Sequence, residues 1–276
     1  MRYSKEFLGE TLGTFMLVLF GCGSVAVTIL FNAHQGLMQI ALAWGISVTL
    51  AIYLTRHLSC AHLNPAVTLA MWVAKRMAAQ KVPAYLTGQF SGAILAGLVI
   101  YLLFGPSISA FEITHNIVRG SSESVQTAKM FGEYYAAPGS LAIVSMPLAM
   151  TAEALGTFLL LLMIFALTEG CNVGRPNDAM APMFIGLTVT SIIGLIAPLT
   201  QAGLNPARDF GPRLIAWAFG WGSAAFPDQT GGFFSVYILA PIIGGMLASL
   251  FFIYLIEPAM KRQSTSNCCN NKDCKK

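Results

Sequence analysis

The sequence predicts an all-α integral membrane protein in which six transmembrane helices and two re-entrant half-helices form an inverted repeat. The first observation is composition: the 276 residues are 55% hydrophobic and 10% charged, whereas soluble domains carry about a quarter charged residues. The second is that six apolar stretches are each long enough to cross a bilayer. The third is that two short motifs recur in the same order in the second half of the chain. This combination excludes a soluble enzyme.

The six apolar stretches are the expected spans, because about 20 apolar residues cross about 30 Å of hydrocarbon as a helix. Two further stretches, 64–77 and 205–219, have helical character but are too short and too polar to span. Each opens with Asn-Pro-Ala, and proline is well tolerated at the first helical position, so each is expected to be a half-helix. The spans are expected at 8–30, 38–55, 83–104, 147–167, 180–199 and 233–256.

Lysine and arginine predict the orientation, because short cytoplasmic loops carry an excess of both. With the N-terminus inside, the connection 105–146 falls outside and both termini are cytoplasmic. We expect one transmembrane domain over 1–258 and no cleaved signal peptide. The polar tail 259–276 is expected to be disordered, with metal binding by its cysteines as the alternative. The inside set is Arg2, Lys5, Arg56, Lys75, Arg76, Lys81, Arg175, Lys261, Arg262 and the tail lysines, against Arg119, Lys129, Arg208 and Arg213 outside.

The internal repeat rests on two motifs. Glu10-Thr-Leu-Gly-Thr-Phe recurs with one change from Glu153, and Asn64-Pro-Ala recurs from Asn205 at nearly the same separation along the chain. The copies, about 6–104 and 147–256, hold three spans each. Because three is odd, the copies must insert with opposite orientation around a pseudo-two-fold axis in the membrane plane. The half-helices are therefore expected to enter from opposite faces and to meet near the midplane.

The half-helices indicate a pore, because irregular backbone at membrane depth is tolerated only where it is buried in protein or lines water. Asn64 and Asn205 stand at the inward ends, where their amides can donate hydrogen bonds to a passing molecule. The alternative is that both asparagines are simply N-caps. Two copies at membrane depth favour a pore built on Asn64, Pro65, Ala66, Asn205, Pro206 and Ala207.

The short segments before the half-helices are expected to be extended, with carbonyl oxygens that have no helical partner. A ladder of such acceptors opposite apolar side chains suits a neutral molecule with hydroxyls. It does not suit a bare ion, which would lose its hydration shell. We expect the carbonyl oxygens of this ladder to come from Cys60, Ala61 and His62 in the first copy and from Gln201, Ala202 and Gly203 in the second.

Charged residues inside the expected helices are costly, so they are candidate functional groups. Glu10 and Glu153 occupy equivalent positions of the repeat, which favours a scaffold role as acceptors for loop amides over the alternative of a proton relay. Arg208 follows the second Asn-Pro-Ala where Val67 follows the first, so one mouth has a guanidinium that can donate to solute hydroxyls and repel cations. Asp209 is also expected to support a loop. The alternative role for Arg208 is a structural ion pair with Asp209.

The sequence indicates no other chemistry. The basic residues form no stripe for nucleic acid, and no nucleophile lies at a workable spacing from a base. No second ligand is spaced with His62 for a metal, and the six cysteines are expected to be free thiols. We therefore expect no cofactor and no enzymatic activity.

Over about residues 5–258 the chain resembles the aquaporin superfamily, and within it the bacterial glycerol facilitators, on its paired Asn-Pro-Ala motifs and inverted halves. The resemblance implies a right-handed helical bundle, a homotetramer with one pore per subunit and a bacterial inner membrane. It also implies a passive channel for glycerol and other small neutral solutes, with some water, that excludes protons and ions. A proton-coupled transporter that uses the two glutamates is the alternative. Three parts of the sequence are similar to the facilitators: the run from Asn205 to Arg213, Pro241-Ile242 and the stretch 111–121.

The resemblance further implies a constriction near the outer mouth. In glycerol facilitators the positions of Ile193 and Ala202 usually hold glycine and phenylalanine, so the sequence departs from that pattern here. The set is more similar to that of plant nodulin-type channels, which the resemblance links to glycerol, metalloid acids and other small neutral solutes. By position, the constriction is expected from Trp44, Ile193, Ala202 and Arg208.

Overall fold

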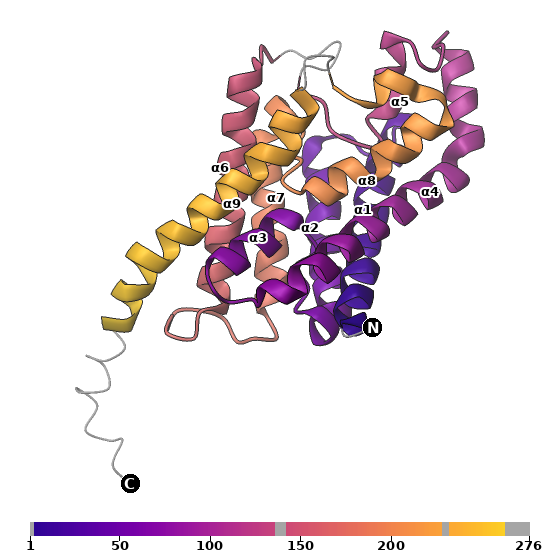
Figure 1. The fold of residues 1–276 in the computed structure, drawn as a ribbon. Coiled ribbons are helices and arrows are strands. Elements are labelled where there is room, and N and C mark those ends of the chain that lie inside the picture. Colours follow the sequence, from indigo (N-terminus) through magenta and orange to yellow (C-terminus); the bar gives the residue numbers. More distant parts are fainter. Residues whose placement is uncertain (1–2, 136–141, 228–231, 263–276) are drawn as a thin grey trace.

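Six helices of the computed structural model are long and apolar enough to cross a membrane, which confirms the predicted spans (Figure 1). The structure describes residues 3–135, 142–227 and 232–262, and the regular elements in these ranges are all helical. The first five spans are α1 (Ser4–Phe31), α2 (Leu37–Ser59), α4 (Val82–Thr114, preceded by η1, Ala79–Lys81), α6 (Met146–Thr168) and α7 (Ala181–Thr200). The sixth comprises η5 (Phe234–Leu239), α9 (Ala240–Phe251) and η6 (Phe252–Ile256) and ends at Arg262.

Two shorter helices, α3 (Pro65–Val73) and α8 (Pro206–Ala216), occupy the predicted half-helix positions. At 1.5 Å per residue they are about 14 and 17 Å long, roughly half the hydrocarbon thickness. Both are shorter than predicted, and α8 passes into a kinked turn, η3 (Trp217–Trp221). α3 lies in the half of the bundle nearer the N-terminus and α8 in the other half (Figure 1).

The connection predicted at 105–146 is partly helical. α4 continues past Pro106 to Thr114, because one proline removes only one backbone donor and the end of the helix is held by tertiary contacts. There Glu112 accepts hydrogen bonds from Arg119 (2.7 Å) and from the Thr127 hydroxyl (2.7 Å). The connection then forms two short turns, η2 (Ser122–Ser124) and α5 (Val125–Ala128).

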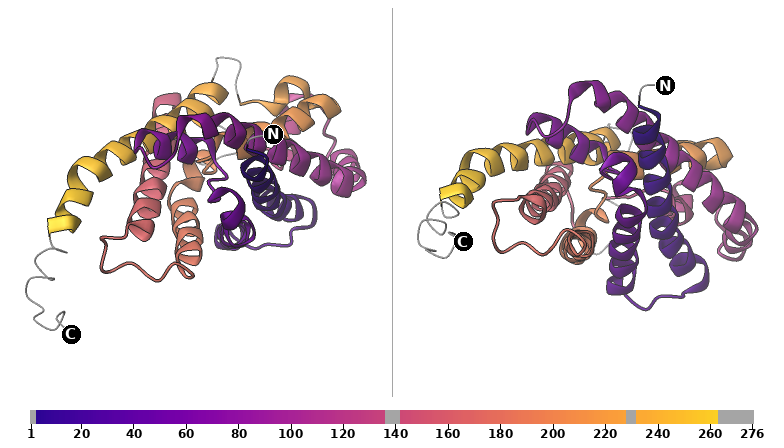
Figure 2. Two further views of the ribbon diagram at one scale, coloured as in Figure 1. Left: turned by 60° about the horizontal axis from the view of Figure 1, so that its bottom comes forward. Right: turned by 90° about the horizontal axis from the view of Figure 1, so that it is seen from below.

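The last helix also runs beyond its predicted end. It continues through residues 259–262, which were expected in the tail, and Lys261 pairs with Glu257 one turn earlier (2.5 Å). The remaining tail, with its three cysteines, lies outside the described residues. Views from two further directions show this helix projecting from the side of the bundle (Figure 2).

Glycines allow the helices to pack closely, as is common in membrane bundles. Where α2 crosses α7, a Cβ on Gly45 would lie 2.6 Å from the Gly186 carbonyl oxygen. The two glycines have the same separation in sequence as the two Asn-Pro-Ala motifs, so this crossing joins equivalent positions of the two copies. A Cβ on Gly92 of α4 or on Gly244 of α9 would similarly lie within 3.0 Å of backbone of α1 or α6.

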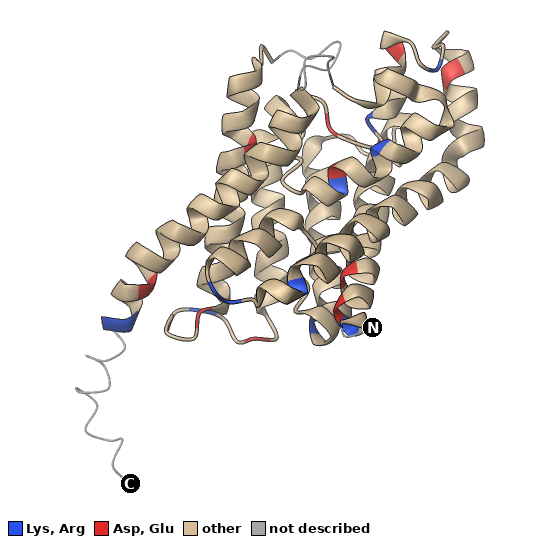
Figure 3. Cartoon of the chain, viewed as in Figure 1, with Lys and Arg blue, Asp and Glu red and all other residues tan. Residues whose placement is uncertain are grey.

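Charged residues are concentrated toward the two ends of the bundle, and only a few lie between (Figure 3). Among the charged residues, Glu10, Glu153, Asp209 and Arg213 are fully buried, and Arg208 is 3% exposed. Both arginines lie in α8, within the half-helix predicted at 205–219.

Candidate functional site

A cavity of about 660 Å³ passes the point where α3 and α8 meet. Asn64 and Asn205 line it, and so does each of the four residues expected at the constriction. Five of the six expected carbonyl residues line it as well, whereas Gln201 does not. The Gln201 side chain instead accepts a hydrogen bond from the Tyr134 amide (2.7 Å). Apolar lining residues include Leu17, Val48, Ile52, Val67, Leu160, Ile164, Ile185 and Val189.

The loops before the half-helices are not extended as predicted. Cys60, Ala61 and Leu63 have left-handed φ values of 64°, 54° and 55°. The equivalent residues of the second copy have φ values of 65°, 62° and 56°. Left-handed non-glycine residues are strained and persist only where the surroundings hold them. The groups that bind these loops must therefore hold the left-handed residues in place.

Glu10 of α1 holds the first loop. It is fully buried, and its Oε1 accepts from the Ser59 hydroxyl (2.7 Å) and the His62 amide (2.9 Å). Its Oε2 accepts from the Leu63 amide (2.6 Å) and the Gln89 side chain (2.6 Å). The carboxylate is not among the groups that line the cavity. This geometry favours the scaffold role.

Glu153 of α6 holds the second loop in the same way. Its Oε1 accepts from the Gly203 amide (2.8 Å) and its Oε2 from the Leu204 amide (2.7 Å). The Thr200 hydroxyl accepts another amide of the loop (3.2 Å), as the Ser59 hydroxyl does in the first copy (3.2 Å). Ser59 and Thr200 were not identified from the sequence, although their separation equals that of Asn64 and Asn205 and could have revealed them.

The two half-helices are joined at their N-termini by reciprocal hydrogen bonds. The Asn64 amide donates to the Leu204 carbonyl (3.0 Å), and the Asn205 amide donates to the Leu63 carbonyl (2.7 Å). Each asparagine oxygen also caps its own helix, at 2.8 Å from the Ala66 amide in α3. Since an amide nitrogen has two N–H groups, each asparagine keeps one donor for the cavity. The N-cap and pore interpretations therefore describe the same side chains.

Arg208 and Trp44 stack on each other at the expected constriction. The guanidinium carbon lies 4.0 Å from the centre of the indole ring, and both side chains are almost fully buried. Ile193 and Ala202 line the same cavity. A Cβ at Gly21 of α1 would lie within 3.0 Å of the indole ring, so only glycine leaves room for it.

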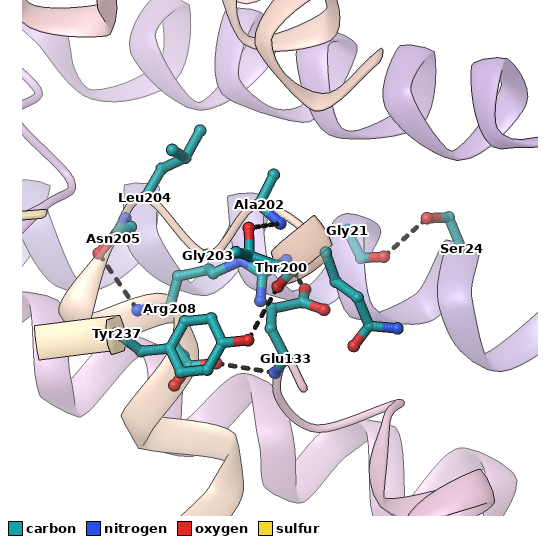
Figure 4. A network of polar contacts seen from close by, with 12 residues as sticks. Gly21, Ser24, Glu133, Thr200, Ala202, Gly203, Leu204, Asn205, Arg208 and Tyr237 are labelled. Carbon is teal, nitrogen blue, oxygen red and sulfur yellow. Dashed lines mark hydrogen bonds and ion pairs between the residues drawn. The ribbon is translucent and has the colours of Figure 1, made fainter. Parts of the chain in front are cut away.

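Glu133, from the connection between α4 and α6, forms an ion pair with Arg208 Nη2 (Figure 4). The expected alternative, a pair between Arg208 and Asp209, is wrong. Asp209 accepts instead from Arg213 Nε (2.8 Å) and from the Glu133 amide (2.8 Å), so it supports the long connection. No sequence pattern identified Glu133, because it lies in a non-periodic stretch.

Burial raises the pKa of the Glu133 carboxyl, and the neighbouring Arg208 opposes that rise. Burial also lowers the pKa of Lys129, four residues earlier in the chain, and the charge of Glu133 opposes that change. Among the described residues, no three His, Cys, Asp or Glu side chains come together as a metal site requires. His62, the residue considered for a metal, contacts the Thr68 hydroxyl (3.3 Å) and the Tyr85 ring (centroids 4.7 Å apart).

Comparisons with known proteins agree with this geometry. The family model described as Major intrinsic protein matches residues 1–252. A propanediol uptake facilitator of Citrobacter freundii is 41% identical over 255 residues, which cover 91% of this chain and 91% of that protein. The glycerol uptake facilitator protein of Escherichia coli (strain K12) is 40% identical over 264 residues, 96% of this chain and 91% of that protein. The X-ray structure of the aquaglyceroporin from Plasmodium falciparum superimposes with a TM-score of 0.81 at 26% identity, covering 94% of this chain and 99% of that one.

Proposed function

This chain belongs to the major intrinsic protein family, and from that premise we propose that it is a passive channel for small neutral polyols. Glycerol and propanediol are the solutes named for its relatives. The observation that carries the proposal is the mixed polar and apolar lining of the cavity. Its lining includes the loops before both half-helices, Asn64 and Asn205, together with aliphatic side chains and Trp44.

A polyol matches such a lining because its hydroxyls and its carbon backbone lie on opposite edges. In this proposal, carbonyls of the loops that line the cavity accept hydrogen bonds from the hydroxyls. At the constriction, Arg208 donates to the same hydroxyls while the carbon edge packs on Trp44 and Ile193. These protein groups replace the hydrogen bonds that the polyol made with bulk water, which keeps the energy barrier to permeation low.

Ions are excluded at the centre by the half-helices. Each N-terminus carries about half a positive charge, so two of them act as about one charge at the meeting point. At about 5 Å and an effective dielectric constant of about 20, Coulomb's law gives about 3 kcal/mol against a cation. Protons and metal cations are therefore expected to be rejected about a hundredfold before dehydration is counted.

The proton-coupled alternative has no support. A relay needs a carboxylate that exchanges protons with the pathway, whereas Glu10 and Glu153 do not line the cavity. Their oxygens already accept hydrogen bonds from loop amides at 2.6 to 2.9 Å. The chain has the character of a channel and not of an enzyme.

We further propose a homotetramer in a bacterial inner membrane, with both termini cytoplasmic and one pore in each subunit. The bias of lysine and arginine toward the N-terminal end supports this orientation. The transmembrane channel domain is taken as 1–258, built of two inverted copies at about 6–104 and 147–256, with the tail 259–276 in the cytoplasm. Multi-angle light scattering of the detergent-solubilised protein tests the tetramer.

Stopped-flow light scattering on proteoliposomes tests the proposed function. Glycerol and propane-1,2-diol should enter well above the rate of empty liposomes, and a protonophore should leave both rates unchanged. Osmotic water flow should also rise. A polyol rate equal to that of empty liposomes, or one that collapses with the proton gradient, would overturn the proposal.

A further inference from the structure

Glu133 is held firmly beside Arg208, which lines the cavity, although Glu133 belongs to a connection and not to a helix. Its amide donates to Asp209 Oδ1 (2.8 Å), and its carbonyl accepts from Arg213 Nη2. The next residue, Tyr134, donates its amide to Gln201 (2.7 Å) and its hydroxyl to the Ala224 carbonyl (2.6 Å). These contacts tie both sides of Glu133 to the second half of the bundle.

Glu133 is 5% exposed, and its carboxylate pairs with one nitrogen of Arg208. Arg208 Nη2 is occupied by this carboxylate, and the plane of the guanidinium lies on Trp44. Arg208 Nη1 is buried and has no hydrogen-bond partner among the described residues. One nitrogen is thus fixed and the other is left as an unused donor beside the cavity that Arg208 lines.

The charges around this point leave Glu133 as the counterion of Arg208. Asp209 and Arg213 form their own closed pair, with Nε and Nη2 each 2.8 Å from a carboxylate oxygen. Lys129, four residues before Glu133, is half-buried and interacts electrostatically with it. Without Glu133, the constriction would carry an uncompensated guanidinium. A buried unpaired cation attracts anions strongly, because little water screens it.

We infer that Glu133 is a positioning residue behind the constriction, which orients Arg208 and cancels its charge so that the constriction selects neutral solutes over anions as well as cations. The inference rests on the proposed function, because it concerns the solutes that the same cavity passes. Two separate tasks follow from the geometry. The length of the side chain fixes Nη2 and thereby aims Nη1, and the negative charge removes the attraction for small anions.

Three variants separate these tasks. Glu133→Gln keeps the size and a hydrogen-bond acceptor but removes the charge, so anions such as formate should permeate about tenfold faster than in the wild type. Glu133→Asp keeps the charge but is one methylene too short, so anion exclusion should persist while glycerol flux falls. Combining Glu133→Gln with Arg208→Gln removes both charges and should return formate flux toward the wild-type level.

The assay is formate and glycerol flux in proteoliposomes at neutral pH, with the membrane potential clamped by potassium and valinomycin. Glu123→Gln is the matched control, since Glu123 lies in the same connection but is exposed. Its fluxes should equal those of the wild type. Glycerol flux of the wild-type protein tests the proposed function, whereas the formate contrast between variants tests the role of Glu133.

Equal formate flux in the wild type and Glu133→Gln, in protein of unchanged melting temperature, would overturn the inference. So would a formate leak of the same size in Glu133→Asp and Glu133→Gln, because a purely structural brace predicts that both changes loosen the mouth alike. A formate leak that grows in the double variant would also contradict charge pairing.

Discussion

Replacing Gly21 by alanine should narrow the constriction, because the added methyl group displaces the Trp44 ring. A Cβ at this position would lie closer than 3.0 Å to three carbons of the Trp44 ring, well inside the ordinary contact distance of 3.4 Å. The ring cannot turn aside freely, because the Arg208 guanidinium lies 4.0 Å from its centre. The indole must therefore move by about 1 Å, away from α1 and toward the cavity, and overpacking of this kind costs about 1 to 3 kcal/mol.

The expected result is a fall of glycerol flux by about tenfold or more, since about 1.4 kcal/mol of added barrier already gives a factor of ten. Water, which is smaller, should lose much less. Stopped-flow light scattering measures both rates on the same proteoliposomes. The ratio of glycerol to water permeability is the decisive quantity, because it does not depend on how much protein is incorporated.

Gly23→Ala is the matched control on the same helix. A Cβ there would meet only the Ile100 side chain, at an ordinary 3.6 Å. Alanine in a helix gains about 0.5 to 1 kcal/mol over glycine, so this variant should be at least as stable as the wild type. If Gly21→Ala folds normally and keeps the wild-type permeability ratio, Trp44 is not a rigid wall of the constriction.

Three further changes test other parts of the site. Ala202→Phe should fill the constriction beside Trp44 and lower the permeability of bulkier polyols relative to glycerol by up to tens of fold; an unchanged ratio would show that Ala202 does not line it. Glu153→Ala should leave two loop amides unpaired, at about 1 to 3 kcal/mol each, and lower the melting temperature, whereas Glu153→Gln keeps an acceptor and should reduce passive flux only modestly. Gly244→Ala should push α9 away from α6 and reduce the yield of folded protein, which size-exclusion chromatography in detergent would detect.

The arrangement of helices could be predicted because the same physical constraint, the bilayer, acts on every span. Length and hydropathy identify a helix in lipid, and the odd number of spans in each copy requires their inversion. Applying the separation between Asn64 and Asn205 to every other position would also have identified Gly45 with Gly186. The ends of helices were less predictable: α4 passes Gly105 and Pro106 because tertiary contacts at Glu112 stabilise its last turns.

Two features of the site had no signal in the sequence. The left-handed loop residues are alanine, cysteine, glutamine and leucine, none of which favours that conformation, and the strain is held by glutamates on distant helices. Glu133 lies far from Arg208 along the chain, in a stretch without hydrophobic periodicity. Its contact depends on how the connection folds back over α8, which no local pattern records.

The reciprocal bonds between Asn64 and the Leu204 carbonyl, and between Asn205 and the Leu63 carbonyl, also set the order of biogenesis. When the first half leaves the ribosome, the partners of Asn64 and Leu63 are about 140 residues from being made, roughly 7 to 28 s at about 5 to 20 residues per second. Polar groups cannot wait unpaired in hydrocarbon. The first half-helix must therefore remain near water or the insertion machinery until the second arrives, so the two half-helices lock together only late in insertion. A nascent chain stopped before residue 200 should consequently expose 60–74 to added protease, and the completed chain should not.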